Sequence, residues 1–177
     1  GDLFIWASPN CGNPQKVQRY PREWAAALRK MDALGAARLF PGHGPPIVGA
    51  DRVRRALRET AELLESLVEQ TLRHMNAGAT LDEVLHRVRA PRALLERPYL
   101  RPVYDDPQFI VRTLWRLYGG WWDGNPARLK PPRDADLSRE LCDAAGGAER
   151  LAERARTLML QGRYELAGSL AQTAFEA

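Results

Sequence analysis

One long amphipathic segment constrains the fold of this chain more than any other feature of its sequence. From Asp51 to Asn76, apolar side chains recur at steps of three and four residues, and Gly78 follows where a C-terminal helix cap is expected. Such a stripe predicts one helix that packs against another helix along its whole length. The residues of the stripe are Val53, Leu57, Ala61, Leu64, Val68, Leu72 and Met75.

The segments after this helix are also expected to be helical. Thr80 and Glu83 form the pattern of a capping box, which starts a helix that must end before Pro91. After a proline-rich connector, Asp106 and Pro107 begin another helix. A further helix is expected over residues 137–145, and the last two over residues 148–160 and 164–175. These last two resemble a single tetratricopeptide hairpin, and one hairpin cannot form a solenoid.

Residues 1–49 have a different pattern, which predicts a piece of α/β structure. Pro21 begins a predicted helix, and residues 38–40 form a predicted buried strand that runs into the glycine-rich loop 41–46. Helix, strand and glycine-rich loop in this order are typical of α/β folds. We therefore expect a mainly α chain, with an α/β piece over residues 1–49 and an all-helical domain over residues 50–177.

Composition limits the classes of partner. The 177 residues are 45% hydrophobic and 27% charged, as in an ordinary globular protein, and no apolar run is long enough to cross a bilayer. The net charge of +4 is too mild and too interspersed to favour nucleic-acid binding, for which Arg112 and Arg116 near the tryptophans would be the candidates. Cys11 and Cys142 lack CxxC spacing, which favours a reducing, cytoplasmic location over a disulfide scaffold.

Two side-chain clusters each have two explanations. An aromatic cluster after the proline-rich connector is either core or an interface. An arginine cluster in the first turns of the long helix is either a solvated surface, in which Arg58 pairs with Glu62, or it faces an acidic surface of another domain or subunit. The aromatic residues are Phe109, Trp115, Tyr118, Trp121 and Trp122, and the arginines are Arg52, Arg54, Arg55 and Arg58.

His43 is the first candidate for chemistry. It directly follows a predicted strand, and Gly42 and Gly44 on either side allow backbone conformations that other residues resist. A rigid strand end with a glycine-flanked imidazole is one way to place a metal ligand precisely. An ordinary polar side chain explains the residue equally well.

The heptapeptide Phe-Pro-Gly-His-Gly-Pro-Pro over residues 40–46 resembles the last metal-ligand motif of the metallo-β-lactamase superfamily. The Gly1-Asp2 step resembles the acidic ligand that bridges two metal ions in that superfamily, and a helix cap or turn residue is the alternative explanation of Asp2. This resemblance implies that residues 1–49 end an αββα sandwich, that Asp2 and His43 are metal ligands, and that two zinc ions are the cofactor. Because the superfamily's His-x-His-x-Asp-His run is not in this sequence, we expect a C-terminal fragment with an incomplete metal site.

A second resemblance covers residues 50–177. Segments 71–78 and 114–129, the latter containing Tyr-Gly-Gly-Trp-Trp-Asp-Gly-Asn-Pro-Ala, are similar to the dimerisation domain of alkyl sulfatases. The resemblance implies a homodimer and, for the full-length enzyme, a small anionic ester substrate whose sulfate contacts Asn13 and Arg19. An ordinary polar loop ahead of a helix remains the alternative explanation of these two residues.

Together these patterns predict the C-terminal part of a zinc-dependent hydrolase resembling alkyl sulfatases, whose helical domain mediates homodimerisation. No residue of this chain is assigned as catalytic. The alternative is a non-catalytic module for dimerisation or protein interaction, attached to a remnant of a hydrolase domain. Metal ligands elsewhere in a longer protein would distinguish the two.

Overall fold

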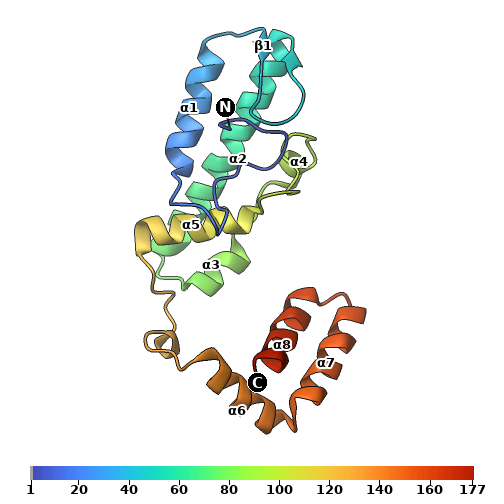
Figure 1. Cartoon of the computed structure of the whole chain (residues 1–177). Helices are drawn as coiled ribbons and strands as arrows, with labels where there is room; N and C mark the ends of the chain where they lie inside the picture. Colours follow the sequence, from blue (N-terminus) through green and yellow to red (C-terminus); the bar gives the residue numbers. More distant parts are fainter. Residues whose placement is uncertain (1) are drawn as a thin grey trace. The chain divides into compact units, whose positions relative to one another are not determined.

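A computed structural model of the chain describes residues 2–177, and Gly1 lies outside the described residues (Figure 1). The chain forms two compact units, Gly1–Asn125 and Pro126–Ala177, which we describe separately. The described part is mainly helical, as predicted, with α-helices α1 to α8 and two short strands. The predicted boundary between residues 49 and 50 concerns domains rather than compact units, and it stays a prediction.

The long helix predicted from the apolar stripe is the centre of the first unit. Helix α2 spans Ala50–Asn76, and α1, spanning Pro21–Ala33, packs along it. Leu57 and Leu64 of the stripe are buried, whereas Leu72 and Met75 at its end are only partly buried. The predicted partner helix is therefore α1, and α2 supplies more residues to the first unit's core than any other element.

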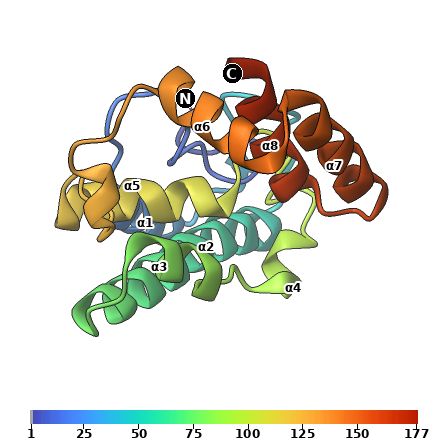
Figure 2. The ribbon, with the colours of Figure 1, turned by 90° about the horizontal axis from the view of Figure 1, so that it is seen from below.

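Shorter helices pack along α2, with α3 and α5 near its C-terminal part (Figures 1 and 2). The predicted capping box is confirmed, because the Thr80 hydroxyl accepts the backbone N–H of Glu83 at 3.3 Å and the Glu83 carboxylate accepts that of Thr80 at 2.9 Å. Asp106 likewise caps the helix that begins at Pro107. The three helices of this region are α3 (Leu81–Arg87), α4 (Arg92–Leu95) and α5 (Pro107–Gly119).

A small hairpin connects α1 to α2. Strands β1 (Arg38–Leu39) and β2 (Ile47–Val48) pair antiparallel, and the glycine-rich loop lies between them. Leu39 is buried, but Phe40 is 68% exposed, so its predicted burial is wrong. Successive strand side chains point to opposite faces, so only Leu39 can face α2 in this short strand.

The second unit is a three-helix arrangement. Helices α7 (Ala148–Leu160) and α8 (Tyr164–Glu176) form the predicted hairpin, and α6 (Asp134–Ala145) packs against α8. A 3₁₀ turn over Pro126–Arg128 precedes them. None of the described helices combines the length and apolar character needed to cross a bilayer. The small core of this unit consists of Ser138, Cys142, Ala155, Leu158 and Ala167.

Candidate functional site

The structure brings Asp2 and His43 together. The carboxylate Oδ1 of Asp2 lies 3.4 Å from Nε2 of His43, and both side chains are more than half exposed. Their backbones converge because Ile5 and His43 form a parallel bridge, in which Trp6 N–H donates to the His43 carbonyl at 3.2 Å. The two candidate ligands predicted from sequence are thus neighbours in space.

Trp6 fixes the loop that carries His43. Its indole N–H donates to the Pro45 carbonyl at 2.7 Å, and its ring covers Gly44. Gly44 has φ +99°, and a Cβ at this position would lie 2.2 Å from Cδ1 of Trp6. Only glycine combines this backbone conformation with so close an approach, which explains one of the two glycines that flank His43.

Two donors alone do not complete a zinc site, which takes three or four protein ligands. A carboxylate and an imidazole are both zinc ligands, so the chemistry of Asp2 and His43 fits part of such a ligand set. Within residues 2–177, no group of three or more potential ligands gathers in one place. Asp2 and His43 therefore stay candidate ligands, and the expectation of an incomplete metal site stays a prediction.

Asn13 and Arg19 lie on the segment that precedes α1. The Asn13 side chain accepts the backbone N–H of Gln15 at 2.9 Å and so stabilises a turn. The Arg19 guanidinium donates to the Asn10 carbonyl and lies 5.9 Å from the centre of the Trp24 ring. Among the described residues, no hydrogen bond or ion pair joins Asn13 or Arg19 to the Asp2–His43 pair.

An indirect connection does exist between Arg19 and the Asp2 segment. The indole N–H of Trp24, on which Arg19 stacks, donates to the carbonyl of Leu3 at 2.7 Å. Leu3 directly follows Asp2 in the chain. The candidate sulfate contact and the candidate metal ligand are therefore parts of one packed arrangement.

Sequence reasoning missed a buried polar group behind this arrangement. Asp105 is 0% exposed, and its Oδ2 accepts the backbone N–H of Gly12 at 2.9 Å. Burial raises the pKa of Asp105, and burial also raises the pKa of the neighbouring Cys11 thiol to about 12. The one signal in the sequence is a second aspartate directly before Asp106, which alone provides the helix cap.

The arginine cluster at the start of α2 has a partner that was not predicted. Nε of Arg58 lies 2.6 Å from Oδ2 of Asp32 on α1, and Nε of Arg54 lies 3.9 Å from its Oδ1. The predicted pairing of Arg58 with Glu62 is therefore replaced by an ion pair between helices. Arg52 and Arg55 instead line a cavity beside Trp6.

The aromatic cluster is divided between core and surface. Trp115 packs against the core, and its indole N–H donates to the Trp122 carbonyl at 3.0 Å. Tyr118, Trp121 and Trp122 are exposed, with Trp121 at 74%. The core explanation is wrong for these three residues, and the interface explanation remains.

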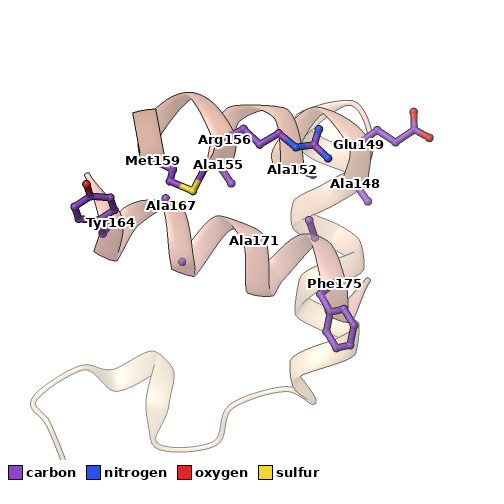
Figure 3. A pocket seen from close by; sticks show the side chains of 12 residues that line it. Ala148, Glu149, Ala152, Ala155, Arg156, Met159, Tyr164, Ala167, Ala171 and Phe175 are labelled. Carbon is purple, nitrogen blue, oxygen red and sulfur yellow. The ribbon is translucent and has the colours of Figure 1, made fainter. Parts of the chain in front are cut away.

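The second unit has an apolar groove between α7 and α8 (Figure 3). Small side chains such as Ala152 and Ala171 form much of its lining, Met159 and Tyr164 lie towards the hairpin turn, and Phe175 lies at the other end. Met159, Tyr164 and Phe175 are exposed, the last at 85%. This apolar surface suits contact with another protein surface better than contact with a small polar ligand.

Comparison with known proteins adds to this geometry. The family model for alkyl sulfatase dimerisation matches residues 80–177, more than half of the chain. A linear primary-alkylsulfatase from Pseudomonas sp. is 35% identical over 153 residues, which cover 86% of this chain and 29% of that protein. An (R)-specific secondary-alkylsulfatase from Pseudomonas sp. is 32% identical over 133 residues, which cover 75% of this chain and 20% of that protein.

A solved structure extends the similarity across both units. The stereoselective inverting sec-alkylsulfatase Pisa1 from Pseudomonas sp. has a TM-score of 0.85 and 29% identity to this chain, covering 97% of this chain and 28% of Pisa1. The chain therefore spans less than a third of the length of these relatives. With the family match over residues 80–177, these similarities place the chain in the alkyl sulfatase dimerisation family.

Proposed function

We propose that the chain is the C-terminal part of a metal-dependent hydrolase of the metallo-β-lactamase superfamily that cleaves alkyl sulfates or related esters. In this proposal, residues 1–49 complete the hydrolase domain and the helical part mediates homodimerisation. The observation that carries the proposal is the 3.4 Å approach of Asp2 to His43, made by two segments that are distant in sequence. The similarity to alkylsulfatases supports the substrate class.

Each predicted site residue has a role in this proposal. When bound, two zinc ions would supply a hydroxide nucleophile near neutral pH. Asp2 and His43 would hold the metal from one side of the site, with the remaining ligands outside this chain. Arg19 would bind the anionic ester through its planar N–H donors, which match sulfate oxygens, and Asn13 would add an amide donor.

The proposal is tested by replacing His43 with Ala in the full-length protein and measuring metal content by elemental analysis. We expect the His43→Ala variant to lose bound zinc and ester hydrolysis together. His86→Ala is the matched control, because His86 is also exposed and also lies 3.4 Å from an aspartate oxygen, that of Asp82. Full zinc occupancy in the His43→Ala variant would contradict the proposal.

We propose homodimerisation through the exposed apolar surface of the second unit. The family model that matches residues 80–177 is described as alkyl sulfatase dimerisation, which supports dimerisation of this chain. The apolar groove between α7 and α8, with Phe175 and Met159 exposed along it, supports the choice of surface. A second chain would remove these side chains from water, and burial of apolar area is the main driving force of such association.

A non-catalytic dimerisation module is the second candidate. It is favoured by one observation, namely that the described residues offer only a pair of candidate metal ligands. On this alternative, the full-length protein would dimerise and bind no zinc. The free, buried Cys11 and Cys142 support a reducing compartment such as the cytoplasm under either candidate.

A further inference from the structure

We infer that Asp105 is a positioning residue, which holds the loop of residues 8–13 and thereby sets the position of Arg19 in the candidate substrate site. The inference rests on the proposed function and extends it to a residue outside residues 1–49. It assigns the connector before α5 a part in substrate binding as well as in folding.

The loop is tied to the connector at two points. The carboxylate of Asp105 accepts the backbone N–H of Gly12 at 2.9 Å, across 93 positions of sequence. At the other end of the loop, the backbone N–H of Ser8 donates to the Arg101 carbonyl at 2.9 Å. A loop held at both ends by one short segment takes its position from that segment.

The approach of the loop to α5 leaves no room for adjustment. A Cβ at Gly12 would lie 2.2 Å from the backbone N of Ile110 and 2.2 Å from the carbonyl carbon of Phe109. Backbone atoms cannot turn aside as a flexible side chain can. The Gly12 backbone therefore lies directly against the first turn of α5, next to the carboxylate that binds it.

Asp105 is an ionisable residue at a place where its charged form is costly. The residue is 0% exposed and its Oδ1 has no hydrogen-bond partner in the described structure. Burial raises its pKa, while the amides of Gly12 and Cys11 and the charge of Arg19 lower it. An apolar side chain would avoid this cost but could not accept the Gly12 N–H, so the contact with the loop is what Asp105 provides at this position.

That effect passes to Arg19 by two routes. Arg19 donates to the carbonyl of Asn10, which lies within the loop that Asp105 holds. The positive charge of Arg19 also acts on both Asp105 and Cys11. A shift of the loop would move the Asn10 carbonyl and free the guanidinium from the orientation it has over Trp24.

The test uses Asp105→Ala and Asp105→Asn in the full-length protein, with alkyl sulfate hydrolysis as one readout. We expect Asp105→Ala to raise KM about tenfold with kcat changed less than about twofold, because Arg19 binds the substrate anion in the ground state. Asp105→Asn keeps an oxygen acceptor for the Gly12 N–H, so we expect it to restore part of the loss.

Cysteine labelling gives a readout that does not need activity. Cys11 is fully buried within the loop, and Cys142 is buried in the other compact unit. Alkylation followed by peptide mass spectrometry should show Cys11 labelled at least about tenfold faster in Asp105→Ala, with Cys142 unchanged as the internal control. Equal acceleration at both cysteines would show general unfolding and would overturn the inference.

The two readouts separate this inference from the proposed function. Unchanged Cys11 labelling in both variants would overturn the inference, whatever the activity. Faster labelling with unchanged KM would also overturn it, because the loop would then have no part in substrate binding. A wild-type protein without hydrolase activity would contradict the proposed function, and faster Cys11 labelling in Asp105→Ala would then still support the loop-holding role.

Discussion

Nε2 of His43 lies 3.4 Å from Oδ1 of Asp2, although one residue is in the hairpin loop between β1 and β2 and the other is close to the start of the chain. The contact depends on Trp6, which binds the hairpin loop through the Pro45 carbonyl and covers Gly44. The geometry of the candidate ligands is therefore set by packing between an indole ring and a glycine.

Gly44→Ala should destabilise the first unit and disturb the candidate metal site. The new methyl group would meet Trp6 in a backbone conformation that costs alanine about 1–2 kcal/mol by itself, so the total loss should be about 2 kcal/mol or more. Urea denaturation measures this loss. Gly35→Ala is the matched control, because Gly35 also has positive φ but nothing within 4 Å. Equal losses for the two variants would contradict the packing role of Gly44.

Leu64→Ala should cost about 3 kcal/mol in the free energy of unfolding, because Leu64 is fully buried in α2 and its removal leaves a cavity. Chemical denaturation of the first unit is the measurement. Leu34→Ala, at a position that is 80% exposed, should change the free energy by less than about 0.5 kcal/mol. A loss below about 1 kcal/mol for Leu64→Ala would mean that α2 is not the centre of the core.

Asp105 should make the free energy of unfolding depend on pH. Its folded pKa is raised above the ordinary value of 3.8, so the protonated acid is the form that folding favours. This contribution is fully present below pH 3.8 and is lost as the pH rises through the folded pKa. Cys11, Arg19 and Asp106 face the same carboxylate, but burial is the largest influence.

The matched variant for this effect is Asp105→Asn, which does not titrate. The stability of Asp105→Asn relative to wild type should increase with pH above 3.8 and level off once Asp105 is ionised in the folded protein. Urea denaturation at a series of pH values measures the difference. A difference that is constant with pH, or that decreases as the pH rises, would show that the folded pKa is not raised.

Phe175→Glu should weaken homodimerisation. Phe175 is 85% exposed at the end of the α7–α8 groove, and a buried unpaired carboxylate there would raise the dimer dissociation constant at least about tenfold. Analytical ultracentrifugation of the chain measures this constant. Leu34→Glu, on an exposed site of the first unit, is the control and should leave the constant unchanged. An unaltered constant in Phe175→Glu would place the interface elsewhere.

Local patterns in the sequence predicted the helices well. The period of the apolar stripe placed α2 within one residue of its observed start, and the Thr80–Glu83 capping box and the Asp106 cap were confirmed. These signals depend on neighbours within one helical turn, so they can be recognised without the fold. The expectation that Asp2 and His43 belong to one site came from a family resemblance. Local pattern could not supply it, because the two residues lie on segments that are distant in sequence.

Relationships across the fold were predicted less well. Arg58 pairs with Asp32 of α1 rather than with Glu62, because the inter-helix partner is presented by tertiary packing. The exposure of Trp121 and Trp122 could not be predicted, because hydrophobic character alone does not decide whether an aromatic residue is core or interface. Asp105 was missed because a second aspartate before Asp106 does not by itself indicate a partner, and its partner Gly12 lies 93 positions away.

The most direct test of the central claim is the zinc content of the full-length protein beside that of this 177-residue chain, by elemental analysis after removal of free metal. The account predicts about two zinc ions per subunit in the full-length protein, and none retained by the chain alone, because Asp2 and His43 are only part of a ligand set. A full-length protein without zinc would contradict the account, as would a chain that by itself binds zinc at full occupancy.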